Sequence, residues 1–220
     1  MVKAVIFDMD GVLIDTEKWL TKYWCQAAGE AGFPMEMKHA LAIRSLAGKY
    51  AEQYLQGIFG DDFSYWEIRE RRKELMREHL KKHGVEKKQG ADELLDYLRE
   101  HKIKTAVATA TDMPRTRSYL TEIGIYDKFD EIICASMVEN GKPKPDIYLY
   151  ACKRLGLTAG ECIAVEDSPN GVRSASSAGL RTIMVPDLTE PDEEIKKLIA
   201  AKAHSLYDVI LMMEDHAAFL

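Results

Sequence analysis

The chain has 220 residues, a length that suits either one large domain or a core with a smaller domain inserted into it. Hydrophobic residues make up 46% of the sequence, which excludes a disordered or fibrous protein. The formal net charge is -6 with both signs interspersed, so the concentrated basic stripe that nucleic-acid binding requires is missing. We therefore expect a folded protein without a nucleic-acid partner.

The cysteines and the apolar runs indicate the compartment. Cys25, Cys134, Cys152 and Cys162 form no C-x-x-C pair, and the apolar strand-like runs around Cys134 and Cys162 suit buried, reduced thiols. The first apolar run is too short for a signal peptide, and no stretch approaches the roughly 18 apolar residues of a membrane span. The sequence predicts a cytoplasmic protein without membrane contact, and we expect a monomer.

The first predicted element is a buried strand over residues 2–7, because its apolar residues run almost without interruption, as in strands covered on both faces of a parallel sheet. Asp8 and Asp10 follow this strand directly. Two carboxylates at its buried end repel each other and lose hydration, so they need a cation to stay ionised. The alternative is that Asp8 caps a turn and that Asp10 with Gly11 forms the bend.

The next segment, residues 17–84, holds only helical patterns, at 17–31, 40–58 and 65–83. It interrupts the sheet between its first two strands. We therefore expect a helical cap over residues 17–84, inserted into a core of residues 1–16 and 85–220, with hinges near 14–16 and 84–90 where a lid can move and exclude water. The alternative is a single domain with an all-helical layer.

The rest of the chain alternates strand and helix patterns. Strands are predicted at 104–109, 131–135, 162–166 and 181–185, and helices at 91–101, 114–123, 146–156 and 169–178. This alternation predicts an α/β fold with a Rossmann-like, doubly wound parallel sheet. The helical region 193–203 and the tail 211–220 are expected to cover one face of the sheet.

Polar side chains follow the predicted strands. Strand one ends at Asp8, strand two at Thr109 and strand four at Glu166 and Asp167, while Lys142 follows strand three. Ligands of open α/β sheets bind outside the carboxyl ends of the strands. The sequence therefore predicts that carboxylates, a hydroxyl and an ammonium group meet at one edge.

This set of groups is typical of phosphoryl transfer through an aspartyl-phosphate. We expect Asp8 to be the nucleophile and Asp10 the acid and base. Mg²⁺ prefers hard oxygen ligands and keeps several waters, which suits Asp8, Asp167 and the backbone carbonyl of Asp10, with Glu166 as a direct ligand or a neighbour of the ligands.

The phosphate would be held by three groups. The Thr109 hydroxyl and backbone N–H groups at Ala110 and the following helix start can donate hydrogen bonds, and Lys142 adds a point charge. Each of these roles has an alternative: Lys142 could be a solvated loop residue, and Thr109 could be present only because β-branched residues favour strands. Glu166 and Asp167 could equally cap the helix that starts near Pro169.

Four segments in this order resemble the four motifs of the haloacid dehalogenase superfamily, in the branch with a helical cap after the first strand. They are Asp8-Met9-Asp10-Gly11-Val12, Ala108-Thr109, Lys142 within Gly-Lys-Pro-Lys-Pro-Asp, and Glu166-Asp167-Ser168. The resemblance covers the chain apart from the variable cap. It implies a Rossmann-like core, Mg²⁺, an aspartyl-phosphate and a small phosphorylated substrate such as a sugar phosphate or a nucleoside monophosphate.

Asp10 favours phosphatase chemistry over dehalogenation, because the dehalogenase relatives lack the second aspartate. The main alternative is a β-phosphoglucomutase-type mutase. Those relatives carry a histidine a few residues after the Asp-Thr turn and a glycine in a cap loop, and residues 15–20 and 43–47 hold neither. A phosphonate hydrolase would need a desolvated cap lysine, for which Lys49 is the candidate, and a non-catalytic binding module is the remaining alternative.

Three cap residues are candidates for substrate contacts. Trp19 follows the nucleophile loop at helical spacing with other aromatic residues, a stripe that could line the cleft or form the cap core. Arg44 and Lys49 flank a predicted loop between cap helices and could reach over the site. The alternative for both is that they are ordinary solvated bases.

Overall fold

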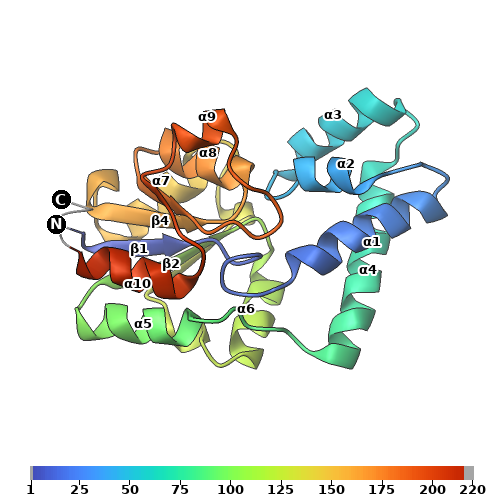
Figure 1. Cartoon of the computed structure of the whole chain (residues 1–220). Helices are drawn as coiled ribbons and strands as arrows, with labels where there is room; N and C mark the ends of the chain where they lie inside the picture. Colours follow the sequence, from blue (N-terminus) through green and yellow to red (C-terminus); the bar gives the residue numbers. More distant parts are fainter. Residues whose placement is uncertain (1, 216–220) are drawn as a thin grey trace.

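The computed structural model describes residues 2–215, and its core is a six-stranded, all-parallel sheet in the order β3-β2-β1-β4-β5-β6 (Figure 1). The strands are β1 (Ala4–Phe7), β2 (Lys104–Thr109), β3 (Glu131–Cys134), β4 (Cys162–Glu166), β5 (Arg181–Met184) and β6 (Ala201–Lys202). The predicted α/β fold with a doubly wound parallel sheet is therefore confirmed.

Strand β1 lies at the centre of the sheet, between β2 and β4. Phe7, its last residue, pairs with Val107 and with Val165, and the N–H of Asp8 continues the pairing by donating to the carbonyl of Val165 over 2.9 Å. The strand order reverses at β1, which is the point where open α/β sheets bind their ligands. The register thus brings the carboxyl ends of β1, β2 and β4 to one edge.

Helices cover both faces of the sheet (Figure 1). Val5 and Phe7 belong to the apolar cluster with α5 (Ala91–Glu100), α6 (Met113–Glu122) and α10 (Leu206–Glu214). Ala4 and Ile6 face the opposite cluster, with α7 (Asp146–Leu155) and α8 (Pro169–Ser177). Alternate residues of the strand are thus buried on both sides, which explains the continuous apolar run in the sequence.

Residues 17–84 form four helices beside the core, which we call the cap helices. They are α1 (Glu17–Glu30), α2 (Met37–Ala42), α3 (Gly48–Phe59) and α4 (Tyr65–His83). Helix α1 packs along α4 (Figure 1), around a cluster that includes Trp24, Phe63 and Tyr65. These helices therefore share an apolar cluster that is separate from the two clusters of the sheet.

One cap helix expected from the sequence is divided. The pattern at 40–58 forms α2 and α3, which are separated by residues 43–47. Ser45 in this loop has φ 59°, in the left-handed region that ends a helix and favours glycine. Residues 43–47 contain no glycine, so Ser45 takes the left-handed backbone conformation in this loop.

The region 193–203 also differs from the expected single helix. It forms the short helix α9 (Glu193–Lys196) and strand β6, in which Ala201 pairs with Ile183 of β5. The sheet edge at β5 offers unpaired backbone groups, so even a two-residue strand satisfies them. Of the tail 211–220, helix α10 takes the residues up to Glu214, and residues 216–220 lie outside the described part.

Short 3-10 helices connect other elements, at Tyr126–Lys128, Ala135–Met137 and Ala159–Glu161. Within residues 2–215, every helix is too short or too polar to cross a membrane.

Candidate active site

Three buried carboxylates meet at the carboxyl edge of the sheet. Asp8 follows β1, Glu166 ends β4 and Asp167 comes next, and one oxygen of each lies within 4.8 Å of the others. The parallel register produces this cluster, because β1 and β4 are hydrogen-bonded neighbours that end at the same level. Like charges at this spacing, without water, require a positive partner.

The cluster fits a divalent cation. The Oδ1 atom of Asp167 is buried and has no hydrogen-bond partner within the described residues. Burial raises the pKa of Asp167 well above its ordinary value although Arg44 lowers it, and burial raises the pKa of Asp8 to about 7 against the opposing effect of Lys142. An orphaned oxygen and hard carboxylate ligands are what Mg²⁺ binding requires.

Lys142 is the buried cation of the cluster. Its Nζ donates to Asp8 Oδ1 over 2.8 Å and to Glu166 Oε1 over 2.6 Å, and the Tyr148 hydroxyl donates to the same Glu166 oxygen over 2.6 Å. Burial lowers the pKa of Lys142, but Asp8 and Glu166 outweigh burial and hold it above its ordinary value. The alternative of a solvated loop lysine is wrong, since the side chain is fully buried.

Asp10 is held apart from the three-acid cluster. Its carboxylate accepts hydrogen bonds from the Thr16 hydroxyl over 2.5 Å and from the Thr111 hydroxyl over 2.9 Å. Two hydroxyls fix its orientation without neutralising it by a salt bridge, which suits a group that gives and takes a proton. A metal contact through its backbone carbonyl stays a prediction.

The loop after β2 carries the predicted phosphate donors. Thr109 is buried at the strand end, where its Oγ1 accepts a hydrogen bond from the Thr111 N–H over 3.0 Å, and Ala110 lines the same cavity as Asp8. The helix that follows begins at Met113 with Asp112 as its N-cap, which accepts from the Arg115 N–H. The helix start therefore offers fewer free N–H groups than expected.

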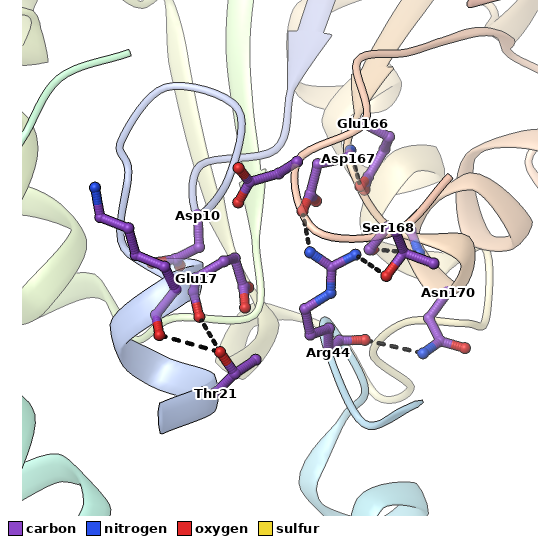
Figure 2. A network of polar contacts seen from close by, with 12 residues as sticks. Asp10, Glu17, Thr21, Arg44, Glu166, Asp167, Ser168 and Asn170 are labelled. Carbon is purple, nitrogen blue, oxygen red and sulfur yellow. Dashed lines mark hydrogen bonds and ion pairs between the residues drawn. The ribbon is translucent and has the colours of Figure 1, made fainter. Parts of the chain in front are cut away.

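Arg44 is buried, which the sequence did not indicate. Figure 2 shows its guanidinium directed at Asp167: Nη1 lies 3.0 Å from Asp167 Oδ2, and Nη2 lies 3.0 Å from Thr189 Oγ1. Asn170 of α8 donates to the carbonyls of Ala42 and Arg44. The α2–α3 loop of the cap is thus fastened to the core at the acidic cluster.

The other two cap candidates lie elsewhere. Trp19 packs against His79, with ring centroids 4.1 Å apart and the rings tilted by 34°, and lines a separate hollow beside the hinge. Lys49 is exposed, and its Nζ donates to Asn140 Oδ1 over 2.7 Å. Neither residue lines the cavity that contains Asp8, and the function proposed below gives neither of them a role.

A cavity between the cap helices and the sheet edge joins these groups. The cavity is lined by carboxylates, cations and apolar side chains, including Asp8, Asp10, Glu17, Arg44, Arg69, Arg72, Thr109, Ala110, Arg115 and Tyr119. Burial raises the pKa of Glu17 to about 8, although Arg44 lowers it. Figure 2 shows Glu17 beside Asp10. Sequence reasoning treated Glu17 as a helix start and missed that its side chain belongs to the site.

Arg72 was also missed. It shares a helix face with Ile68, Leu75 and Met76, which are buried. The helical spacing of α4 places this charged residue on the apolar face, and that pattern could have indicated a site, because charged residues are rarely buried without a ligand or an ion pair.

Comparison with known proteins identifies the family. A family model described as haloacid dehalogenase-like hydrolase matches residues 5–185. The chain belongs to this family. The resemblance inferred from the four motifs is therefore confirmed, and strands β2 to β5 and the site residues from Asp8 to Asp167 lie within the matched range.

Two relatives of this haloacid dehalogenase-like hydrolase are phosphatases. The chain is 31% identical to the phosphorylated carbohydrates phosphatase of Thermotoga maritima, over 83% of this chain and 84% of that protein. It is also 31% identical to hexitol phosphatase A of Escherichia coli, over 86% and 88%. The chain is a phosphoric monoester hydrolase.

A solved structure agrees with the fold. The β-phosphoglucomutase from Clostridium difficile superposes with a TM-score of 0.83, covering 99% of this chain and 97% of the other, at 23% identity. A likeness at this identity shows the fold alone and says nothing of the reaction.

Position 171 requires a glycine, because the side chain of Glu166 occupies the space that a Cβ would take. A Cβ on Gly171 would lie 2.0 Å from Glu166 Oε2 and 2.2 Å from Oε1. We expect Gly171→Ala to lower the free energy of unfolding by about 1–3 kcal/mol, as overpacking does, and to reduce turnover by displacing Lys142. Urea unfolding and phosphate release measure the two effects.

Gly57→Ala is the matched control, since Gly57 lies at an exposed position of α3 where an added Cβ meets no neighbouring atom within 4 Å. That change should stabilise the protein by about 0.5–1 kcal/mol. Equal effects of the two changes would contradict the packing argument.

Proposed function

We propose that this chain hydrolyses a small phosphate monoester, of the sugar phosphate or nucleoside monophosphate type, with Mg²⁺ and through an aspartyl-phosphate on Asp8. The observation that carries the proposal is the unequal setting of the two aspartates. Asp8 contacts Lys142 within a three-acid cluster, whereas Asp10 is held at the cavity wall by two hydroxyls. One environment suits a nucleophile beside a transferring phosphoryl group, and the other suits an acid and base.

In the first step, a carboxylate oxygen of Asp8 forms a bond to phosphorus while the bond from phosphorus to the leaving oxygen breaks. Asp10 in its protonated form gives its proton to that oxygen, so the alcohol leaves neutral. Lys142 and the donors at Thr109 and Ala110 hold the phosphoryl oxygens, on which negative charge is spread.

In the second step, Asp10 takes a proton from a water molecule, and the resulting hydroxide oxygen bonds to phosphorus. The bond between phosphorus and the Asp8 oxygen breaks, which releases inorganic phosphate and restores both aspartates. The cap helices limit the water that reaches the cavity before this step, and the hydroxyls of Thr16 and Thr111 keep Asp10 oriented.

Asp8 and Asp167 would hold Mg²⁺, because Asp167 Oδ1 has no hydrogen-bond partner among residues 2–215, whereas Glu166 Oε1 is shared by Lys142 and Tyr148. When bound, the cation neutralises charge on the phosphoryl oxygens and favours the ionised carboxylate. Glu166 would then act by positioning Lys142. The phosphatase relatives, one of them named for phosphorylated carbohydrates, support the substrate type.

The test is Mg²⁺-dependent turnover of sugar phosphates and nucleoside monophosphates, β-glucose 1-phosphate included, with free phosphate and isomerised sugar phosphate scored in parallel. We expect free phosphate, and we expect EDTA to lower its release by at least about 100-fold, since the carboxylates alone cannot neutralise the transferring group. Restoring Mg²⁺ should restore the rate.

Two outcomes would contradict the proposal. Phosphate release that persists in EDTA would remove the metal from the reaction. Glucose 6-phosphate formed without free phosphate would identify a mutase, and the missing histidine in residues 15–20 would then have been given too much weight.

A further inference from the structure

The cavity has two ends of opposite charge. The end at the sheet carries the carboxylates of Asp8 and Asp10, and there the guanidinium of Arg44 bonds to Asp167. The three other guanidinium groups of the lining form what we call the arginine end. The arginine end comprises Arg69 and Arg72 of α4 and Arg115 of α6. The reaction proposed above uses none of these arginines.

Arg72 is the central member, and it is buried without an anionic partner. Only 7% of the residue is exposed, and its Nε has no hydrogen-bond partner within the described residues. No salt bridge to Arg72 occurs among residues 2–215, although the adjacent Arg71 bonds to both Glu30 and Glu74. A buried charge normally has a partner, because losing hydration is costly.

The neighbours of Arg72 make its position more costly. Burial, together with the charges of Arg115 and Arg69, lowers the pKa of Arg72 to about 10. Its guanidinium lies over the Trp24 ring, 5.2 Å from the centroid, which compensates only in part. Arg115 bonds to Asp112 through Nε over 2.9 Å, and Arg69 lies over Trp66. Three like charges thus share one wall, and among residues 2–215 the salt bridge that reaches them is the one from Asp112 to Arg115. Asp10 and Glu70 attract these charges only from a greater distance.

Packing alone does not explain this wall. A residue that served only to fill the α4 stripe would be apolar, like Ile68 and Met76 beside it. Burying an arginine beside like charges is unfavourable unless a bound anion offsets the cost. The planar guanidinium group matches the oxygens of a phosphate or a carboxylate.

Resting on the phosphatase function proposed above, we propose that the arginine end binds a second anionic group of the substrate. The ester phosphate lies at Asp8, and a phosphate or carboxylate on the same molecule lies at Arg72, Arg69 and Arg115. The preferred substrates are therefore doubly anionic small metabolites, which are sugar bisphosphates or phosphorylated acids.

Two substrate pairs test the proposal and separate the two anions. Fructose 1,6-bisphosphate is compared with fructose 6-phosphate, and 3-phosphoglycerate with glycerol 3-phosphate, which replaces the carboxylate by a hydroxymethyl group. We expect kcat/KM to be about 10-fold to 100-fold higher for the doubly anionic member of at least one pair, the range that a charge-assisted hydrogen bond supplies. The pair that shows the preference identifies the anion.

Variants then assign the preference to the arginine end. Arg72→Met should reduce the ratio of kcat/KM within the preferred pair by at least about 10-fold, and Arg72→Lys should keep part of it. Arg69→Met, at a half-buried position, gives the same readout if Arg72→Met does not fold. Arg77→Met is the control, because Arg77 is exposed on the same helix, and it should leave the ratio unchanged.

The two proposals fail in different ways. Hydrolysis of p-nitrophenyl phosphate with ratios near one in both pairs would overturn the arginine end and leave the phosphatase intact. If p-nitrophenyl phosphate is not hydrolysed, the proposed reaction fails. The arginine end is then judged by calorimetric binding of both pairs to Asp8→Asn protein, where equal affinities within each pair would overturn it.

Discussion

Replacing Asp8 with Asn is expected to lower kcat by about 1,000-fold or more, the order of loss seen when a nucleophile is removed. The amide has the same shape but cannot attack phosphorus, and its oxygen alone can still accept from Lys142. The measurement is Mg²⁺-dependent phosphate release by purified variant and unmodified protein at the same concentration. Circular dichroism should show that the fold is kept.

Asp61→Asn is the matched control, because Asp61 is an exposed aspartate in the loop between α3 and α4. This change should leave kcat within about twofold, as expected for surface substitutions. If the Asp8 variant keeps its activity while the control behaves as expected, the nucleophile lies elsewhere or a contaminant is responsible.

The sequence was sufficient for the sheet and for the residues at its carboxyl edge. Apolar runs that end in polar residues are a local signal, and the rules of parallel sheets bring such ends together whatever their separation along the chain. Asp8 and Lys142, 134 positions apart, lie within hydrogen-bond distance at the edge that the predicted parallel sheet required. The two-residue strand β6 was missed because only its pairing with β5 defines it.

The cap residues could not be placed in the same way. Helix periodicity gives the buried face of α4 but does not reveal which part of the core that face meets. Arg44 was expected either to reach over the site or to be solvated, and the α2–α3 loop places it at Asp167, 123 positions away. Trp19 had the right spacing for the cleft but turns toward His79. Each outcome depends on the angle between cap and core, which no local pattern encodes.

Replacing Lys142 with Met is expected to affect both stability and activity. The change keeps most of the side-chain volume but leaves Asp8 and Glu166 buried without their shared cation, which typically costs about 3–5 kcal/mol. Turnover should also fall by about 100-fold or more, because a fixed charge at the transferring phosphoryl group is lost. Urea unfolding without added Mg²⁺ and phosphate release with it measure the two effects.

The stability loss should depend on pH in a defined direction. The pKa of Lys142 lies above its ordinary value, so its contribution is fully present from pH 5.5 to 8. The pKa of Asp8 is raised to about 7 even with Lys142 in place. The free energy of unfolding therefore falls as pH rises from the pKa of Asp8 in the unfolded chain to its pKa in the folded protein. Without the Lys142 cation the folded pKa of Asp8 is higher, so the free energy of unfolding keeps falling at higher pH. We therefore expect the free energies of unfolding of variant and unmodified protein to differ more at pH 8 than at pH 5.5.

Lys144→Met is the control, because Lys144 is an exposed lysine two positions away. It should show neither the stability loss nor its pH dependence. Equal stability of the Lys142 and Lys144 variants at pH 8 would contradict the role of Lys142 as the cation of the acidic cluster.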